Sequence, residues 1–128
     1  MLRIIIFFCF CVAGVSRLQA QAHLAMDSTT HTFGEVKQGE NPIYTFMVKN
    51  TGNSPLIINS VEPSCGCVTA SYTGEPIPPG GSGAIQLVFV TETHLGFQLR
   101  STTISTNADN AETVLYMKGT VIKRKGLL

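Results

Sequence analysis

Two cysteines separated by one residue are the part of the sequence with the clearest capacity for chemistry. They are Cys65 and Cys67, on either side of Gly66, in a turn-rich stretch near the middle of the chain. Three interpretations of this Cys-Gly-Cys motif are open: a disulfide across Gly66, a site for a soft metal ion, or a structural corner between strands. The sequence alone assigns it no role.

A disulfide between Cys65 and Cys67 is sterically allowed. Residues two apart in an extended or turned chain have Cα atoms near the upper part of the range of about 4.4–6.8 Å that disulfides span. Gly66 has no Cβ and can adopt the backbone that so small a ring demands. Closing a three-residue loop removes only about 1.5 kcal/mol of unfolded-state entropy, however. Such a bond therefore stabilises the fold only slightly. If it is exposed and strained, it is easily reduced.

A metal site is the second interpretation. Two thiolates at this spacing suit a soft ion such as Cu(I), whereas tetrahedral zinc usually takes four ligands. Further ligands would have to come from a methionine or from one of the three histidines, and none of these lies at a spacing typical of a metal site: His23, His31, His94. The sequence therefore predicts no cofactor, with Cu(I) as the one candidate.

The third interpretation, a tight corner with both cysteines half-buried as small hydrophobic residues, is the one that we favour. Thioredoxin-like chemistry needs two residues between the cysteines and a βαβ context. The motif here has one intervening residue, and the sequence around it shows no helix. A disulfide oxidoreductase is therefore not expected.

No other group of residues forms a recognisable active site. The glycine-rich stretch 80–83 lacks the lysine and the following helix of a phosphate-binding loop. The hydroxyl and acidic side chains that might serve in catalysis have no partner at a diagnostic spacing: Ser60, Glu62, Ser64, Glu75, Glu92. We therefore expect that the protein is not an enzyme.

Residues 1–22 have the pattern of a cleavable secretory signal peptide. A positive charge at Arg3 precedes an apolar run, and small residues follow it. That run is interrupted at Ser16 and Arg17, short of the ~20 apolar residues that span a bilayer. We expect cleavage after Ala22, with Ala20 as the second choice. Residues 23–128 then form one exported domain, periplasmic or secreted, without a membrane span.

Removal of the signal peptide changes both the charge and the cysteine content. It takes away two of the nine basic residues, none of the eight acidic ones, and two of the four cysteines, so the net charge goes from +1 to −1. A near-neutral domain has no electrostatic footprint for nucleic acid. The basic residues 123–125 are interpreted as a solvated tail. Cys65 and Cys67 are the only cysteines left, in a compartment that permits disulfides.

Short segments of alternating apolar and polar residues fill residues 23–128 and predict strands. Seven such segments are separated by turn signals, and no segment has helical spacing: 28–33, 43–49, 56–61, 68–73, 84–90, 98–106, 113–122. Residues 23–27 are expected to be irregular, 34–39 to form a turn and 74–81 a loop. About seven strands predict an immunoglobulin-like β-sandwich, with a small barrel as the alternative.

Several short motifs together resemble the bacterial family catalogued as domain of unknown function 1573. They are Phe33-Gly34-x-Val36-x-x-Gly39, Phe46-x-Val48-x-Asn50-Thr51-Gly52, Pro55-Leu56-x-Ile58, Ser64-Cys65-Gly66-Cys67, Ile77-x-Pro79-Gly80 and Gly119-x-Val121. The resemblance implies an exported bacterial protein with an immunoglobulin-like fold, similar to Hydin and major-sperm-protein-like domains. It implies no activity and attaches no role to Cys65 and Cys67.

The sequence thus leaves two classes of function. We expect an exported, non-enzymatic module with a protein-interaction or accessory role in the cell envelope, for which strand addition at an exposed sheet edge is a suitable mode of binding. The sequence identifies neither the partner nor the edge. The alternative is a thiol redox or Cu(I)-handling protein that uses Cys65 and Cys67.

Overall fold

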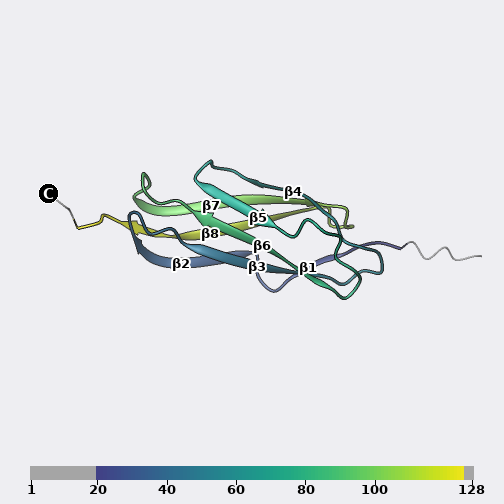
Figure 1. Cartoon of the computed structure of the whole chain (residues 1–128). Helices are drawn as coiled ribbons and strands as arrows, with labels where there is room; N and C mark the ends of the chain where they lie inside the picture. Colours follow the sequence, from purple (N-terminus) through teal and green to yellow (C-terminus); the bar gives the residue numbers. More distant parts are fainter. Residues whose placement is uncertain (1–19, 126–128) are drawn as a thin grey trace, which may run out of the picture.

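The structure, a computed structural model, describes residues 20–125 as two stacked β-sheets without a helix (Figure 1). The described chain begins at one end of the elongated sandwich and finishes at the other. This confirms the predicted all-β, immunoglobulin-like class. The eight strands are β1 (Leu24–Met26), β2 (Thr30–Lys37), β3 (Ile43–Asn50), β4 (Ile58–Pro63), β5 (Val68–Tyr72), β6 (Ser82–Phe89), β7 (Gly96–Thr106) and β8 (Glu112–Ile122).

The first five strands alternate between the two sheets, after which β6 stays in sheet A and β7 and β8 lie in sheet B. Sheet A has the order β1-β3-β6-β5, and sheet B has the order β2-β8-β7-β4. Every pairing is antiparallel except that of β2 with β8, which is parallel. Alternate residues of the inner strands fill the space between the sheets, each contributing about 1.5–3 kcal/mol by its burial: Phe46, Val48, Ile85, Leu87, Phe89, Ile104, Leu115, Met117, Val121.

Two segments form strands where the sequence analysis expected none. Residues 24–26, expected to be irregular, form β1 against the end of β3. Residues 34–37, expected to form a turn, continue β2 along β8. The register shifts between Thr32 and Gly34, and Gly34 has a φ of 72°, a conformation open to glycine at little cost. In both cases a distant strand supplies the pairing that the local pattern could not reveal.

The predicted signal peptide lies outside the described residues except for its last three. Of these, Ala22 is buried in the core, and its carbonyl accepts a hydrogen bond of 3.0 Å from the Asp109 N–H. The Gln21 carbonyl likewise accepts one of 3.0 Å from Asn53 N–H. Cleavage after Ala20 would preserve these contacts, whereas cleavage after Ala22 would remove them. Cleavage itself stays a prediction.

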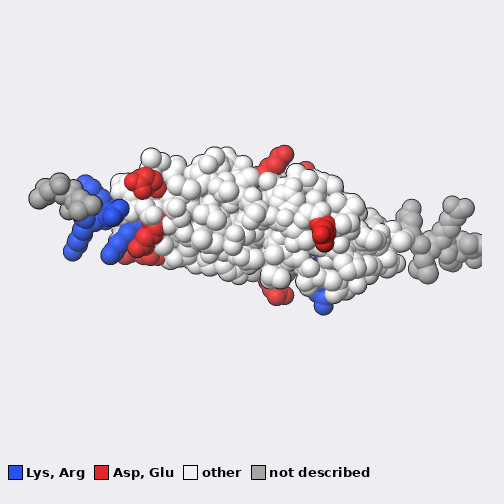
Figure 2. Space-filling view, in the orientation of Figure 1, with Lys and Arg blue, Asp and Glu red and all other residues white. Residues whose placement is uncertain are grey.

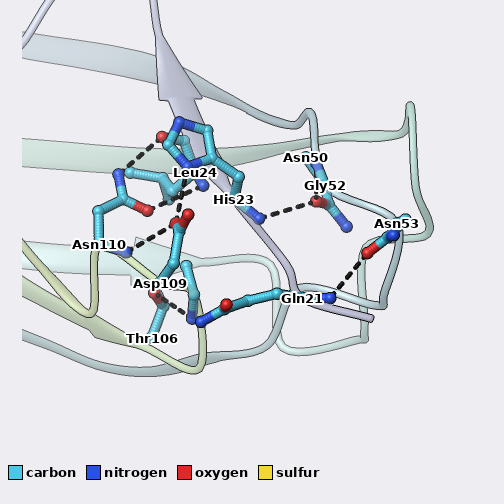
Figure 3. A network of polar contacts seen from close by, with 10 residues as sticks. Gln21, His23, Leu24, Asn50, Gly52, Asn53, Thr106, Asp109 and Asn110 are labelled. Atoms are coloured by element: carbon cyan, nitrogen blue, oxygen red, sulfur yellow. Dashed lines mark hydrogen bonds and ion pairs between the residues drawn. The ribbon is translucent and has the colours of Figure 1, made fainter. Parts of the chain in front are cut away.

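A buried asparagine fixes the end of the sandwich where the described chain begins (Figure 3). The Asn50 side-chain amide donates to the carbonyls of Ser54 (2.7 Å) and Ile77 (3.0 Å). Its oxygen accepts from the backbone N–H groups of Gly52 (3.0 Å) and His23 (3.3 Å). Asn50 therefore joins three segments that lie outside the eight strands.

Asn110 performs a similar task for β1. Its oxygen accepts from the Leu24 N–H at 3.1 Å, and its amide donates to the Leu24 carbonyl at 2.9 Å. Next to it the His23 ring nitrogen Nδ1 lies 2.7 Å from the Asp109 carboxylate. This hydrogen bond lowers the pKa of Asp109. The side chains of the 107–110 turn thus hold the start of the domain in place.

Candidate functional site

The Cys-Gly-Cys motif lies where the chain crosses from sheet B to sheet A, between β4 and β5. The last contact with sheet B is the Ser64 N–H, which donates to the Ser101 carbonyl at 2.9 Å. Beyond the motif, the Cys67 carbonyl accepts a hydrogen bond of 2.8 Å from the N–H of Val90, the residue after β6 of sheet A. The motif is thus a connection at the side of the sandwich, tied to one sheet at each end.

Within this connection the two cysteines form a disulfide. The S–S distance is 2.02 Å, and the Cα atoms lie 5.1 Å apart. The backbone N–H of Cys67 donates to the Cys65 Sγ at 3.1 Å. Cys67 packs against the core, whereas Cys65 does not belong to that cluster, and Gly66 faces open space. The motif is therefore both a corner and a disulfide, and its sulfurs sit at the border between core and solvent.

Only one of the three candidate histidines lies at the disulfide. A ring nitrogen of His94 and the two sulfurs all lie within 4.8 Å of one another. His31 instead stacks on Tyr44, with ring centroids 3.8 Å apart, and burial lowers its pKa. His23 lies at the Asp109 turn described above. No spacing in the sequence indicated His94, because it reaches the motif from the turn between β6 and β7.

Thr91 holds that turn. Its hydroxyl donates to the Glu40 carbonyl at 2.8 Å and accepts from the Gly39 N–H at 2.9 Å. Its carbonyl accepts a hydrogen bond of 3.0 Å from the His94 N–H. Thr91 is fully buried, so these bonds are shielded from water. The position of His94 is therefore set by Thr91, which anchors this turn to Gly39 and Glu40.

Arg100 is the functional residue that the sequence analysis missed. It lies on the same face of β7 as the buried residues Gln98 and Thr102, two positions away on either side, so its side chain points between the sheets. The guanidinium carbon lies 5.7 Å from the centroid of the Phe89 ring, a cation–π contact. Its Nη2 lies 3.3 Å from the His94 Nδ1 and also donates to the Gln98 side-chain oxygen. The period-two pattern of 98, 100 and 102 was the signal available in the sequence.

Among the described residues, no carboxylate balances this inward-facing cation. Among residues 20–125, one ion pair occurs. It joins His23 and Asp109 and does not involve Arg100. The Nε of Arg100 is buried and has no hydrogen-bond partner in the same part of the chain. Arg100 as a whole is half-buried, but a donor atom withdrawn from water normally has an acceptor. Arg100 therefore has one buried donor without an acceptor among residues 20–125, and it reaches the disulfide by way of His94.

The contact with Arg100 also fixes the state of the His94 ring. A guanidinium has donors only, so His94 Nδ1 must accept, and the proton of the neutral ring is on Nε2. A histidine that binds a metal usually donates its other ring N–H to an acceptor. In His94 that second nitrogen would be Nδ1, which faces the Arg100 guanidinium instead of an acceptor. The arrangement therefore suits an anionic sulfur better than a metal ion ligated by His94.

The same crossing leaves half of β7 without a neighbour. β4 pairs with β7 only between Thr102 and Thr106, so residues 96–101 pair with β8 alone. Because Ser101 directs its carbonyl to Ser64, the alternation of a strand turns the backbone groups of Phe97 and Leu99 to this open side. Within residues 20–125 these groups have no strand partner. We call residues 97–101 the free β7 edge.

Large apolar side chains accompany this edge. Phe97 is 68% exposed and Leu99 is 52% exposed. On the face shown in Figure 2, charged side chains are few in the middle of the molecule and gather toward the end where the described chain finishes, which is also the end where β7 begins, because Phe97 pairs with Thr120. Natural sheets usually protect their edges with charge, proline or a covering segment. The free β7 edge has no proline, and its one charged residue, Arg100, points between the sheets, so Phe97 and Leu99 are not accompanied by an outward-facing charge.

The comparisons with known proteins concern family and fold. A family model described as "Protein of unknown function (DUF1573)" matches residues 24–121. No curated protein matches the chain in sequence. Among the described residues, no helix has the length and apolar character needed to cross a membrane.

Several solved structures share the fold at low sequence identity. A protein of unknown function from Porphyromonas gingivalis W83 aligns with a TM-score of 0.72 and 20% identity, covering 84% of this chain and 51% of that one. This chain thus spans about half of that protein. The PapD-like domain 7 of human CEP192 aligns with a TM-score of 0.64 and 11% identity, covering 82% and 89%. The YadV chaperone aligns with a TM-score of 0.56 and 16% identity, covering 81% and 54%.

Proposed function

The chain belongs to the DUF1573 family of unknown function, and from that premise we propose that it is an exported, non-enzymatic interaction module that binds by strand addition at the free β7 edge. The occupant is an extended segment of another exported protein, with apolar residues at alternate positions. Such a segment would complete the open half of sheet B.

One observation carries this proposal: the unpaired backbone groups of β7 coincide with exposed apolar side chains. Strand addition draws affinity from main-chain hydrogen bonds and specificity from alternate side chains. Phe97 and Leu99 present both at once, because each has its backbone groups toward the open side and its side chain in solvent. β7 differs in this from the outer strands of the two sheets. β1, β2, β4 and β5 each have an open side along their whole length, whereas β7 is open along one half only.

Photo-crosslinking in the native cell envelope tests the proposal. A photoreactive phenylalanine analogue is placed at Phe97 in one variant and at Tyr72, an exposed residue of edge strand β5, in another. We expect a discrete protein adduct from position 97 and none from position 72. Leu99→Pro removes an N–H that faces the open side and leaves the β8 pairs in place, so it should abolish the adduct.

Equal adducts at both positions, or an adduct at 97 that persists in Leu99→Pro, would contradict strand addition. Thermal denaturation of Leu99→Pro serves as the control for folding. If that variant is unstable, Leu99→Lys takes its place, since a charged side chain also discourages edge pairing.

The disulfide supports a second candidate function, thiol redox or Cu(I) handling, and the position of His94 near both sulfurs favours the redox version, because its Nδ1 already faces Arg100. The two versions differ in what the motif carries in its own compartment. Mass spectrometry of the protein isolated from the envelope separates them. Stoichiometric copper supports the metal version, whereas a stable dithiol that takes up no Cu(I) removes both.

A further inference from the structure

We propose that the Cys65–Cys67 disulfide exchanges with thiols by opening at Cys65, and that Arg100 and His94 stabilise the thiolate then released on Cys67. The reacting partner is a cysteine thiol of another molecule. The proposal rests on the second candidate function, thiol redox at Cys65 and Cys67, and does not depend on strand addition at β7.

The first argument is that Arg100 has neither a counter-charge nor a full set of hydrogen-bond acceptors among the described residues. Its cation points between the sheets with no carboxylate partner among residues 20–125, and its buried Nε has no acceptor there. Its Nη2 reaches His94 Nδ1, and a nitrogen of that ring lies within 4.8 Å of both sulfurs. An intact disulfide carries no charge, but an opened one leaves a thiolate. Cleavage therefore creates the anion that this corner of the sandwich lacks.

The second argument decides which sulfur is attacked. Cys67 packs against the core, so an incoming thiol approaches Cys65 more easily. The mixed disulfide thus forms on Cys65. Gly66 leaves open space beside the bond.

The exchange balances without any further reagent. The partner's thiol loses its proton to solvent, and its sulfur forms a bond to Cys65 Sγ while the Cys65–Cys67 bond breaks. The electron pair of the broken bond goes to Cys67 Sγ, which becomes a thiolate and then takes a proton. A second thiol of the partner can attack the mixed disulfide. Two electrons and two protons have then passed from the partner's dithiol to Cys65 and Cys67.

The experiment uses glutathione as the probe on protein expressed as the full chain and purified from the envelope of a bacterial host. After acid quenching, peptide mass spectrometry locates the glutathione adduct, and the rate of disulfide opening is followed at fixed pH. We expect the adduct on Cys65. Arg100→Gln should slow opening by about fivefold to tenfold, because a poorer leaving thiolate departs more slowly.

Two matched variants separate this role from a structural one. Arg100→Lys keeps the charge and should recover most of the rate, whereas Arg124→Gln, which removes an exposed cation elsewhere, should leave it unchanged. Thermal denaturation confirms that each variant is folded, and His94→Gln gives a second slow variant if Arg100→Gln is not. An adduct on Cys67, no adduct on the folded protein, or equal rates for Arg100→Gln and the unsubstituted protein would overturn the proposal.

Discussion

Replacing Phe89 by alanine is expected to lower the free energy of unfolding by about 3–5 kcal/mol, the usual cost of truncating a buried phenylalanine. Phe89 is fully buried at the end of β6. Its ring lies 5.9 Å from that of Phe33 and 5.8 Å from that of His94, and it also contacts the Arg100 guanidinium. The substitution would therefore leave a cavity in the core directly beside the disulfide site.

Urea denaturation measures this effect, and Phe97→Ala is the matched control. Phe97 is the same residue type but is 68% exposed, so its truncation should change stability by less than about 0.5 kcal/mol. Comparable losses in the two variants would mean that Phe89 does not occupy the interior as described.

Replacing Asn50 by alanine is expected to destabilise the protein by about 3–4 kcal/mol. The substitution leaves the Ser54 carbonyl and two N–H groups without their partner and removes one of the two donors to the Ile77 carbonyl. Each unsatisfied buried group costs about 1–3 kcal/mol, less where water can enter. The groups affected belong to three segments, the chain before β1, the 50–54 turn and the 74–81 loop. We also expect this end of the sandwich to become sensitive to limited proteolysis.

Asn53→Ala provides the comparison. The Asn53 side chain is exposed and accepts a single hydrogen bond, of 2.7 Å, from the Gln21 N–H. Its loss should cost less than about 1 kcal/mol in the same denaturation experiment. If Asn50→Ala costs no more than Asn53→Ala, the role of Asn50 as a buried junction is wrong.

The strands of the inner sandwich were predictable because their own residues carry the period-two pattern. The alternation of Leu115, Met117, Gly119 and Val121 placed these residues on one face, and the structure buries this face. β1 and the second half of β2 were not predictable in this way. Both depend on pairing with strands far away in the sequence, and local propensity carries little information about such pairs.

For the site, the sequence indicated the two cysteines but not their surroundings. His94 was one of three equal candidates, and only the packed turn held by Thr91 brings it to the sulfurs. Arg100 was overlooked because a charged residue in a strand is expected to face solvent. The free β7 edge was equally hidden, since it exists only because β4 leaves the sheet at Ser64.

Amide hydrogen exchange along β7 tests the central claim, the open edge, most directly. In the isolated native protein, the N–H groups of Phe97 and Leu99 should exchange rapidly, whereas those of Gln98 and Arg100, which face β8, should be protected. An alternation of fast and slow amides from residue 97 to residue 100 is the predicted result. Uniform protection of all four amides would show that this half of β7 is already covered, and would contradict the account.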